Sequence, residues 1–186
     1  MPSVAFLGYG ATQTRLVDHL CDQGADVSHH TGPSRDFGDV DLVVSFGYRH
    51  ILKPEVLATA RRPVLNLHIS YLPYNRGAHP NFWSWIEGTP AGVSIHEIDA
   101  GIDTGAVVDQ QRLLVSPEGL SFRETHVMLI EAVEALFVAR CADILAGCYR
   151  AKPQSGEGTF HRMADLPDWM DDWDMPITKA IARHHG

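Results

Sequence analysis

The sequence predicts an α/β fold in which a mostly parallel sheet is flanked by helices. Apolar runs of strand length alternate with segments of helical spacing, which is the order expected of parallel α/β units. One of these runs, "DLVVSFG", is continuously apolar, as strands buried on both faces usually are. Glycine or proline separates most of the runs, so the boundaries between elements are readable.

The first elements are a strand, a helix and a second strand. The strand covers 3–8, the helical segment covers 12–24 and stops at a glycine, and the second strand covers 25–31. About ten residues, rich in Gly and Pro, lead to the third strand at 41–47. A crossover helix needs at least ten to twelve residues. We therefore expect a loop here, and a sheet that is shortened in its N-terminal half.

The middle of the chain continues with short helices and further strands. Pro54 suits the first turn of a helix. The predicted elements are a helix at 53–60, a strand at 63–70, an aromatic helix at 79–88, and strands at 91–99 and 105–115.

The longest predicted helix covers 121–147. Ser121 and Glu124 have the spacing of a capping box, and Gly147 ends the helix. After Arg150 the composition becomes linker-like, and two tryptophans follow in an acidic tail. Exposed tryptophan pairs are unusual, so the tail is expected to dock on its own domain or on a partner, for instance in a homodimer through Trp169 and Trp173.

Composition excludes several classes of function. The net charge of -8 argues against a nucleic-acid partner, which would require a basic face. No apolar run reaches the roughly 18–20 residues of a membrane helix, and the N-terminus lacks the basic start of a signal peptide. The three cysteines have no metal-ligand spacing, so we expect no metal site and reduced, packed thiols in a cytoplasmic protein.

A glycine turn follows the first strand. Its sequence, "GYGATQT", is similar to loops that bind phosphate at a helix N-terminus. The full dinucleotide pattern requires glycine where this chain has Gln13. A substrate site at Gly10 and an ordinary turn both remain open.

Polar side chains interrupt the apolar strand at 63–70. Asn66, His68 and Ser70 alternate along it, so they share one face. Buried polar groups cost stability unless they have partners. Ligands in open α/β sheets lie at the carboxyl ends of strands, which is where this strand delivers these groups. A satisfied core feature is an equally good explanation for them taken alone.

A second polar cluster follows the strand at 91–99. Asp99 has the position of a backbone cap in a glycine turn, whereas Asp103 lies deeper in the loop. A carboxylate near His68 would favour the protonated ring. An Asn donor, a His and an Asp are what acyl transfer to an amine requires. No Ser or Cys has an adjacent base, so attack by a substrate amine fits better than a covalent nucleophile.

Residues 65–110 are similar to the formyltransferase family that uses 10-formyltetrahydrofolate, and the resemblance extends from about 41 to 145. The family includes glycinamide ribonucleotide, methionyl-tRNA and amino-sugar formyltransferases. Its motif Asn-x-His-x-Ser-Leu-Leu-Pro is matched by Asn66, His68, Ser70, Leu72 and Pro73, with Tyr71 in place of the first Leu. Its motif Asp-x-Gly-x-Asp-[Thr/Gly]-Gly is matched by Asp99, Gly101, Asp103, Thr104 and Gly105. The pair is far more specific than either motif alone.

The resemblance implies a Rossmann-like formyltransferase fold, with residues 1–150 as the catalytic domain and 151–186 as a C-terminal tail or helix. Asn66, His68 and Asp103 would be the catalytic residues, and His96 would lie nearby in a structural role. The cofactor, 10-formyltetrahydrofolate, would contact Tyr48, Arg49, His50, Ile51, Leu52, Ile98, Asp99 and Gly101. The acceptor amine would lie near Gly10, Ser70, Arg76, Gly77, His79 and Thr104.

The acceptor stays open at this stage. A small-molecule amine, such as an amino sugar linked to a nucleotide, and an aminoacyl group on a carrier protein both fit a role in natural product biosynthesis. The short N-terminal half, together with the segments 75–85 and 158–165, is most similar to the formylation domains that open some nonribosomal peptide synthetases. Amino-sugar enzymes are the other close type, but they generally carry extra C-terminal structure. Hydrolysis of the formyl-folate, or folate binding without catalysis, are the alternatives to transfer.

Overall fold

The computed structural model describes residues 1–186. A six-stranded sheet has the order β2-β1-β3-β4-β6-β7, and β5 and β8 form a separate pair. Strands β1 to β4 are parallel, whereas β6 and β7 join by antiparallel pairing at one edge, so the mostly parallel sheet is confirmed. The strands are Ser3–Gly8 (β1), Asp26–His30 (β2), Leu42–Phe46 (β3), Leu65–His68 (β4), Arg76–Gly77 (β5), Gly92–Glu97 (β6), Val107–Arg112 (β7) and Phe160–His161 (β8).

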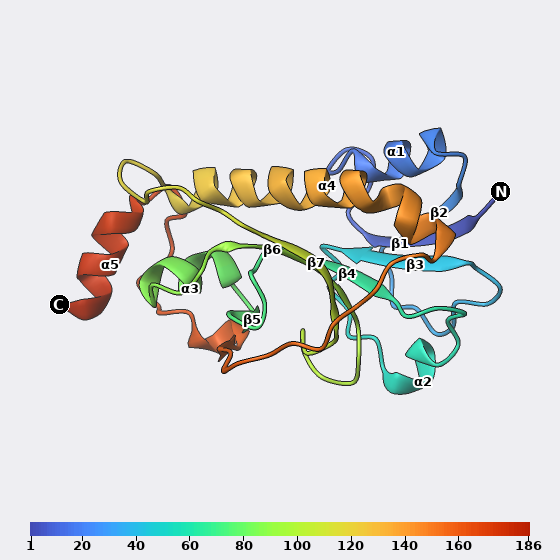
Figure 1. Ribbon diagram of the computed structural model, residues 1–186. Coiled ribbons are helices and arrows are strands. Elements are labelled where there is room, and N and C mark those ends of the chain that lie inside the picture. Colours follow the sequence, from blue (N-terminus) through green and yellow to red (C-terminus); the bar gives the residue numbers. More distant parts are fainter.

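Helices cover both faces of the sheet. The long helix α4 (Phe122–Ala146) and the short α1 (Leu16–Asp22) lie on one face, and α2 (Pro54–Leu57) lies on the other (Figure 1). The other helices lie beyond one end of the sheet, at the end of the molecule where the C-terminus is found. They are α3 (Pro80–Ile86), the 3-10 helix η1 (Met163–Asp165) and α5 (Ile177–His185). None of these helices has the length and apolar character needed to cross a lipid bilayer.

Helix α4 begins and ends where its sequence predicts. The Ser121 side chain accepts a hydrogen bond from the Glu124 N–H, and the Glu124 carboxylate accepts one from the Ser121 N–H at 2.8 Å. Gly147 adopts the left-handed conformation, with φ of 69°, that ends many helices. Both features satisfy backbone groups that a helix terminus otherwise leaves unpaired.

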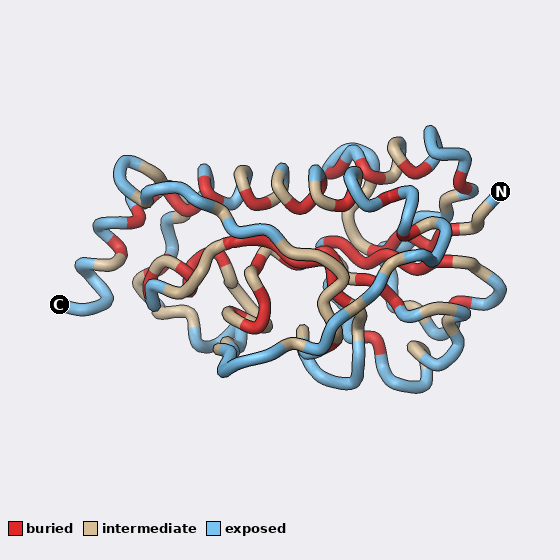
Figure 2. The backbone as a smooth tube through the Cα atoms, viewed as in Figure 1, coloured by how far each residue is buried: buried red, intermediate tan, exposed pale blue.

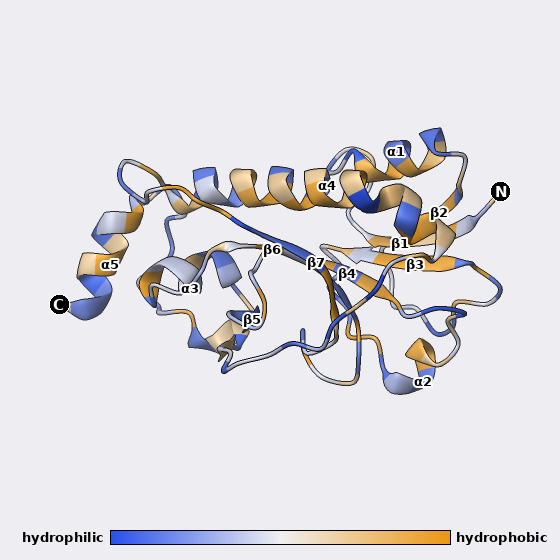
Figure 3. Cartoon of the chain, viewed as in Figure 1, coloured by the Kyte–Doolittle hydropathy of each residue, from blue (hydrophilic) through white to orange (hydrophobic).

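The main core lies between α4 and the sheet. One face of α4 buries residues at spacings of three and four, and Figure 2 shows this face in red while the outer face is pale blue. The central strands β1 and β3 are orange in the hydropathy view, whereas the edge strand β7 carries blue, polar segments (Figure 3). The helix contributes Leu129, Val133, Phe137, Cys141 and Ile144 to this core.

The N-terminal half of the sheet is shortened, as predicted. The chain passes from β2 to β3 without a helix. Phe37, from this connection, is 7% exposed and packs with Leu7 and Val43 on the face opposite α4. An aromatic side chain of the loop thus covers surface that a crossover helix would bury.

The C-terminal residues pack onto α3. Met170, Met175 and Ile177 are buried with Phe82 and Trp83 in a second apolar cluster. Trp169 and Trp173 are partly buried against the same cluster. The apolar side of the tail is therefore in contact with the rest of the chain.

Three expectations about local structure are wrong. Helix α1 begins at Leu16, because residues 11–13 form a turn after Gly10. Strand β4 ends at His68, so Ser70 lies in the bend that follows. Only Cys141 is packed, since Cys21 and Cys148 are exposed. Helix α4 ends before position 148, which removes Cys148 from the helix face that buries Cys141.

Phe137→Ala is expected to lower the free energy of unfolding by about 3–5 kcal/mol, because it removes a fully buried ring between α4 and the sheet. Val127→Ala, on the exposed side of the same helix, is the control, and its effect should stay within about 0.5 kcal/mol. Urea denaturation of both variants measures the difference. Equal losses would contradict the assignment of this face to the core.

Candidate active site

Two neighbouring strands bring the first polar side chains together. In the pairing of β4 with β6, Asn66 lies opposite His96. The Asn66 Nδ2 is 3.1 Å from His96 Nε2, and His96 Nδ1 is 2.9 Å from the Glu97 carbonyl oxygen. A carbonyl oxygen only accepts, so Nδ1 of His96 carries a proton, and Nε2 accepts from the Asn66 amide. One N–H of the Asn66 amide is held in this way, and the other is left for a ligand.

The Asp103 carboxylate lies between two histidines. Its Oδ1 is 3.5 Å from His96 Nε2, its Oδ2 is 3.7 Å from His68 Nε2, and the Gly77 N–H donates to Oδ2 at 2.8 Å. Burial by itself raises the pKa of a carboxyl. Interaction with His68, together with the hydrogen bond from the Gly77 N–H, outweighs burial and holds the pKa of Asp103 well below its ordinary value. The carboxylate is therefore ionised at neutral pH.

His68 is a buried, neutral imidazole beside this carboxylate. Burial is the main cause that lowers the pKa of His68, and the charge of Asp103 opposes it in part. His68 Nε2 lies 3.4 Å from the Asn75 carbonyl oxygen, so this nitrogen carries the proton of the neutral ring. An N–H donor next to a carboxylate can stabilise a developing oxyanion or relay a proton.

Left-handed backbone is concentrated around these side chains. The non-glycine residues with positive φ are Asn75 (52°), His79 (53°) and Asp103 (53°). The left-handed conformation costs an L-residue roughly 1–2 kcal/mol, less for Asn and Asp. Asn75 supplies the carbonyl near His68, and Asp103 supplies the carboxylate. Backbone strain of this kind clusters at functional sites.

A cavity of about 220 Å³ opens beside Asn66 and Asp103. No backbone group of residues 48–52 bonds to another backbone group, so this stretch offers free N–H donors and carbonyl acceptors. Such a set fits the polar edge of a pterin, and the apolar lining suits its flat faces. The lining residues are Ser45, Tyr48, His50, Ile51, Leu52, Asn66, His96, Ile98, Asp99, Ala100, Gly101, Ile102 and Asp103.

Most residues that the resemblance assigned to the cofactor line this cavity. Arg49 does not, although its neighbours do. Asp99 acts as the expected cap, because it accepts hydrogen bonds from the Gly101 N–H at 3.0 Å and from the Thr104 hydroxyl at 2.6 Å. The Thr104 hydroxyl is therefore engaged within the loop and is not free for a substrate.

The residues expected near the acceptor fall into two groups. The Ser70 hydroxyl donates to the Tyr74 carbonyl, and Arg76 Nε donates to Gln154 Oε1 at 3.2 Å. Both side chains therefore form hydrogen bonds within the chain. Gly77 holds Asp103 through its N–H. His79 stacks on Trp173, with ring centroids 5.6 Å apart, and lines a hollow of about 360 Å³ next to Ile69.

Gly10 lies apart from these residues, in the turn that precedes α1. Its N–H faces the side-chain oxygen of Gln13 at 3.4 Å, and its carbonyl accepts from the N–H groups of Gln13 and Thr14. The turn is closed on itself and is not the start of a helix. A phosphate-binding loop of the usual kind is therefore not formed here.

The resemblance placed His96 near the site in a structural role, but it gave no sign that this ring holds the Asn66 amide. Sequence reasoning missed Asn75, whose carbonyl faces His68. The cross-strand register that joins Asn66 to His96 leaves no signal in a single sequence. Asn75 could be recognised, because asparagine followed by Arg-Gly is typical of a left-handed turn.

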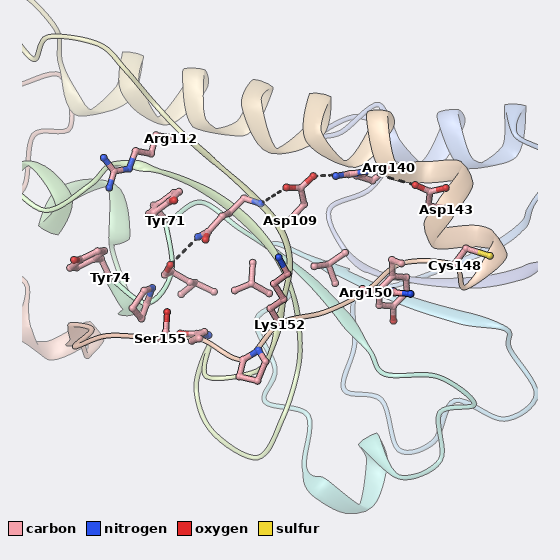
Figure 4. Close-up of a pocket in the computed structure, with 18 residues that line it drawn as sticks. Tyr71, Tyr74, Asp109, Arg112, Arg140, Asp143, Cys148, Arg150, Lys152 and Ser155 are labelled. Atoms are coloured by element: carbon pink, nitrogen blue, oxygen red, sulfur yellow. Dashed lines mark hydrogen bonds and ion pairs between the residues drawn. The ribbon is translucent and has the colours of Figure 1, made fainter.

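A larger groove, of about 710 Å³, is lined by residues of β7, the C-terminal part of α4 and the segment 148–155 (Figure 4). It runs along the outer edge of β7, and Arg112, Arg140 and Lys152 project toward it. Asp109 and Asp143 pair with Arg140 there. Asn66, His68 and Asp103 are all absent from its lining, so this groove is separate from the cavity beside Asn66 and Asp103.

A family model described as Formyl transferase matches residues 34–136. The chain belongs to the formyl transferase family. This formyl transferase is a folate-dependent enzyme that moves one-carbon (formyl) groups, and its formyl donor is 10-formyltetrahydrofolate. The matched segment includes Asn66, His68 and Asp103 and both motifs of the sequence.

Solved structures extend the similarity over the whole chain. The formyltransferase PseJ from Anoxybacillus kamchatkensis is 33% identical, with a TM-score of 0.89 over 97% of this chain and 98% of PseJ. Its structure contains UDP-4,6-dideoxy-4-formamido-L-AltNAc and tetrahydrofolate.

More distant structures share the fold. A 4-N formyltransferase from Francisella tularensis is 19% identical, with a TM-score of 0.81 over 98% of this chain and 87% of that one. Methionyl-tRNA formyltransferase from Clostridium thermocellum is 15% identical, with a TM-score of 0.68 over 87% of this chain and 72% of that one.

His68→Gln is expected to weaken the loss of stability in mild acid. The lowered pKa of His68 means that, as pH falls through the unfolded value of about 6.5, the unfolded chain takes up a proton that the native chain does not. Stability contributed by neutral His68 is thus present above that pH and lost below it. Chemical denaturation at pH 7.5 and 5.5, compared with the wild type, measures the difference; an identical decline in both proteins would contradict a buried neutral ring.

Proposed function

We propose that this formyl transferase acts on the amino group of a nucleotide-linked amino sugar. The observation that carries the proposal is the similarity to PseJ, which matches the chain over nearly its full length and contains a formamido sugar nucleotide. The extra C-terminal structure that the sequence analysis expected of amino-sugar enzymes is not present in that relative, since 98% of it is covered. A short chain is therefore no argument against a sugar acceptor.

We assign Asn66 and His68 to oxyanion stabilisation. The bound 10-formyltetrahydrofolate supplies the formyl carbon and leaves as tetrahydrofolate. The N–H of Asn66 that His96 does not hold, and the Nε2–H of His68, would donate to the formyl oxygen as it gains negative charge. Both side chains are held in place before substrate binds, and only the long contact of the His68 N–H with the Asn75 carbonyl, at 3.4 Å, is exchanged for the formyl oxygen.

We assign proton transfer to Asp103. The acceptor nitrogen must lose a proton as it bonds to the formyl carbon, and the leaving nitrogen must gain one as its bond to that carbon breaks. Asp103 is ionised and lies beside His68, with Oδ2 3.7 Å from the His68 Nε2, so its carboxylate can accept the first proton and return it. The Gly77 N–H keeps the carboxylate in place through both steps.

The acceptor is tested with the purified chain, 10-formyltetrahydrofolate and a panel of amines, following tetrahydrofolate release by absorbance. The panel contains UDP- and dTDP-linked amino sugars, free amino acids and an aminoacylated carrier protein. Turnover with a nucleotide-linked amino sugar and none without amine is the expected result. Preference for the carrier-bound aminoacyl group would replace the proposed acceptor, and equal turnover without amine would indicate a hydrolase.

Asn66→Ala should lower kcat by roughly 100- to 1,000-fold, the usual loss for one oxyanion donor. Asp103→Asn, which keeps the shape of the side chain and removes its charge, should also lower kcat by orders of magnitude. The exposed Gln111→Ala is the control and should match the wild type. Folded variants, checked by circular dichroism, that keep near-normal rates would refute these assignments.

A further inference from the structure

A segment beyond α4 crosses the outside of both catalytic loops. Residues 152–161, here termed the strap, connect the end of α4 to η1 and pass along the sheet on the side away from α4 (Figure 1). The strap starts at Lys152, which exchanges two backbone hydrogen bonds of 2.8 Å with Val107 at the start of β7. It ends in β8, which pairs with β5. Both ends are thus attached to elements that flank the site.

The first catalytic loop is held by Gln154. Its side-chain Nε2 donates to the carbonyl oxygens of Asp103 at 2.7 Å and Gly105 at 2.9 Å. Its Oε1 accepts from Arg76 Nε at 3.2 Å, which ties the two loops to each other. The strained left-handed backbone of Asp103 needs such support, because otherwise it relaxes toward common conformations.

The second catalytic loop is held by Thr159. Its Oγ1 accepts from the Asn75 N–H at 2.8 Å and donates to the Asn75 Oδ1 at 3.1 Å. The Thr159 carbonyl accepts from the Arg76 N–H at 3.0 Å. These bonds fix the residue whose carbonyl faces His68, and they lie next to the Gly77 N–H that binds Asp103.

The strap contributes little to the core. None of its residues belongs to the three buried apolar clusters, and most are exposed. Its outer side borders the open groove of Figure 4, where Lys152 and Ser155 lie on the groove wall. The side-chain hydrogen bonds of Gln154 and Thr159 are instead directed at the two loops that carry the reactive groups.

We propose that the strap positions the site for catalysis. In this role Gln154 fixes the backbone of Asp103, and Thr159 fixes Asn75, whose carbonyl faces His68. The inference rests on the proposed roles of His68 and Asp103. It adds two positioning residues from a part of the chain that lies outside the matched segment 34–136. Neither residue contacts the reacting atoms; each acts through the loop that it holds.

Thr159→Val keeps the shape of the side chain and removes both hydrogen bonds of the hydroxyl. One such bond contributes about 1 kcal/mol, which corresponds to about a five-fold change in rate. We expect kcat to fall about 5- to 50-fold, since misplaced reactive groups add to the loss, while the KM values for folate and amine change less than about two-fold. Thr159→Ser restores the hydroxyl and should recover most of kcat. Gln154→Ala should behave like Thr159→Val.

Ser155→Ala is the matched control, because this neighbouring hydroxyl lies in the strap and makes no hydrogen bond within the chain. Hydrogen exchange followed by mass spectrometry provides the second readout. Peptides covering 75–79 and 103–106 should exchange faster in Thr159→Val and Gln154→Ala, while peptides from α4 remain protected as in the wild type.

Each outcome decides between the explanations. Faster exchange throughout α4 together with lost activity would mean that the strap only stabilises the fold. Wild-type kcat in Thr159→Val and Gln154→Ala, with Asn66→Ala and Asp103→Asn inactive, would overturn the positioning role and leave the proposed function intact. Activity retained in Asn66→Ala and Asp103→Asn would refute the proposed function itself.

Discussion

The buried carboxylate of Asp103 is the group on which the arrangement of the site depends. An ionised carboxylate removed from water must be compensated by donors and by opposite or polarised charge. Here the donors are the N–H groups of His68 and Gly77, which belong to β4 and β5. The site can therefore form only when β4, β5 and the loop after β6 are in their final positions, so folding and the geometry of the site are closely coupled.

The change from parallel to antiparallel pairing is what brings these segments together. Parallel strands β1 to β4 deliver their carboxyl ends to one edge of the sheet, as in other α/β folds. Strand β6 runs against β4, so the middle of one strand faces the middle of the other and Asn66 meets His96. The loop after β6 then returns across the end of β4 with Asp103. Polar side chains from the antiparallel strands β4 and β6, and from the loop after β6, therefore lie next to one another.

Much of this architecture is predictable from the sequence, because strand and helix periodicity, the Ser121–Glu124 box and the glycine stops act locally. That Asn66, His68 and Asp103 lie close together could be inferred from the paired motifs. Properties that depend on long-range contact could not. The hydrogen bonds of Gln154 join residues far apart along the chain. The early end of β4 and the use of the Ser70 and Thr104 hydroxyls within their own loops depend on local backbone geometry that composition does not encode. The linker-like composition of the strap gave no indication of the hydrogen bonds that Gln154 and Thr159 form.

The left-handed residues have a consequence for attempts to make the protein more robust. Asn75, His79 and Asp103 occupy backbone conformations that glycine adopts without strain. A laboratory selection for heat resistance alone would be free to relieve that strain at these positions, and at Asp103 the relief removes the carboxylate. Gains in melting temperature and losses in turnover would then arise from the same substitutions, a trade-off seen where active sites hold unfavourable geometry. Stabilising changes are better sought on the far side of α4, where the chain has no such conflict.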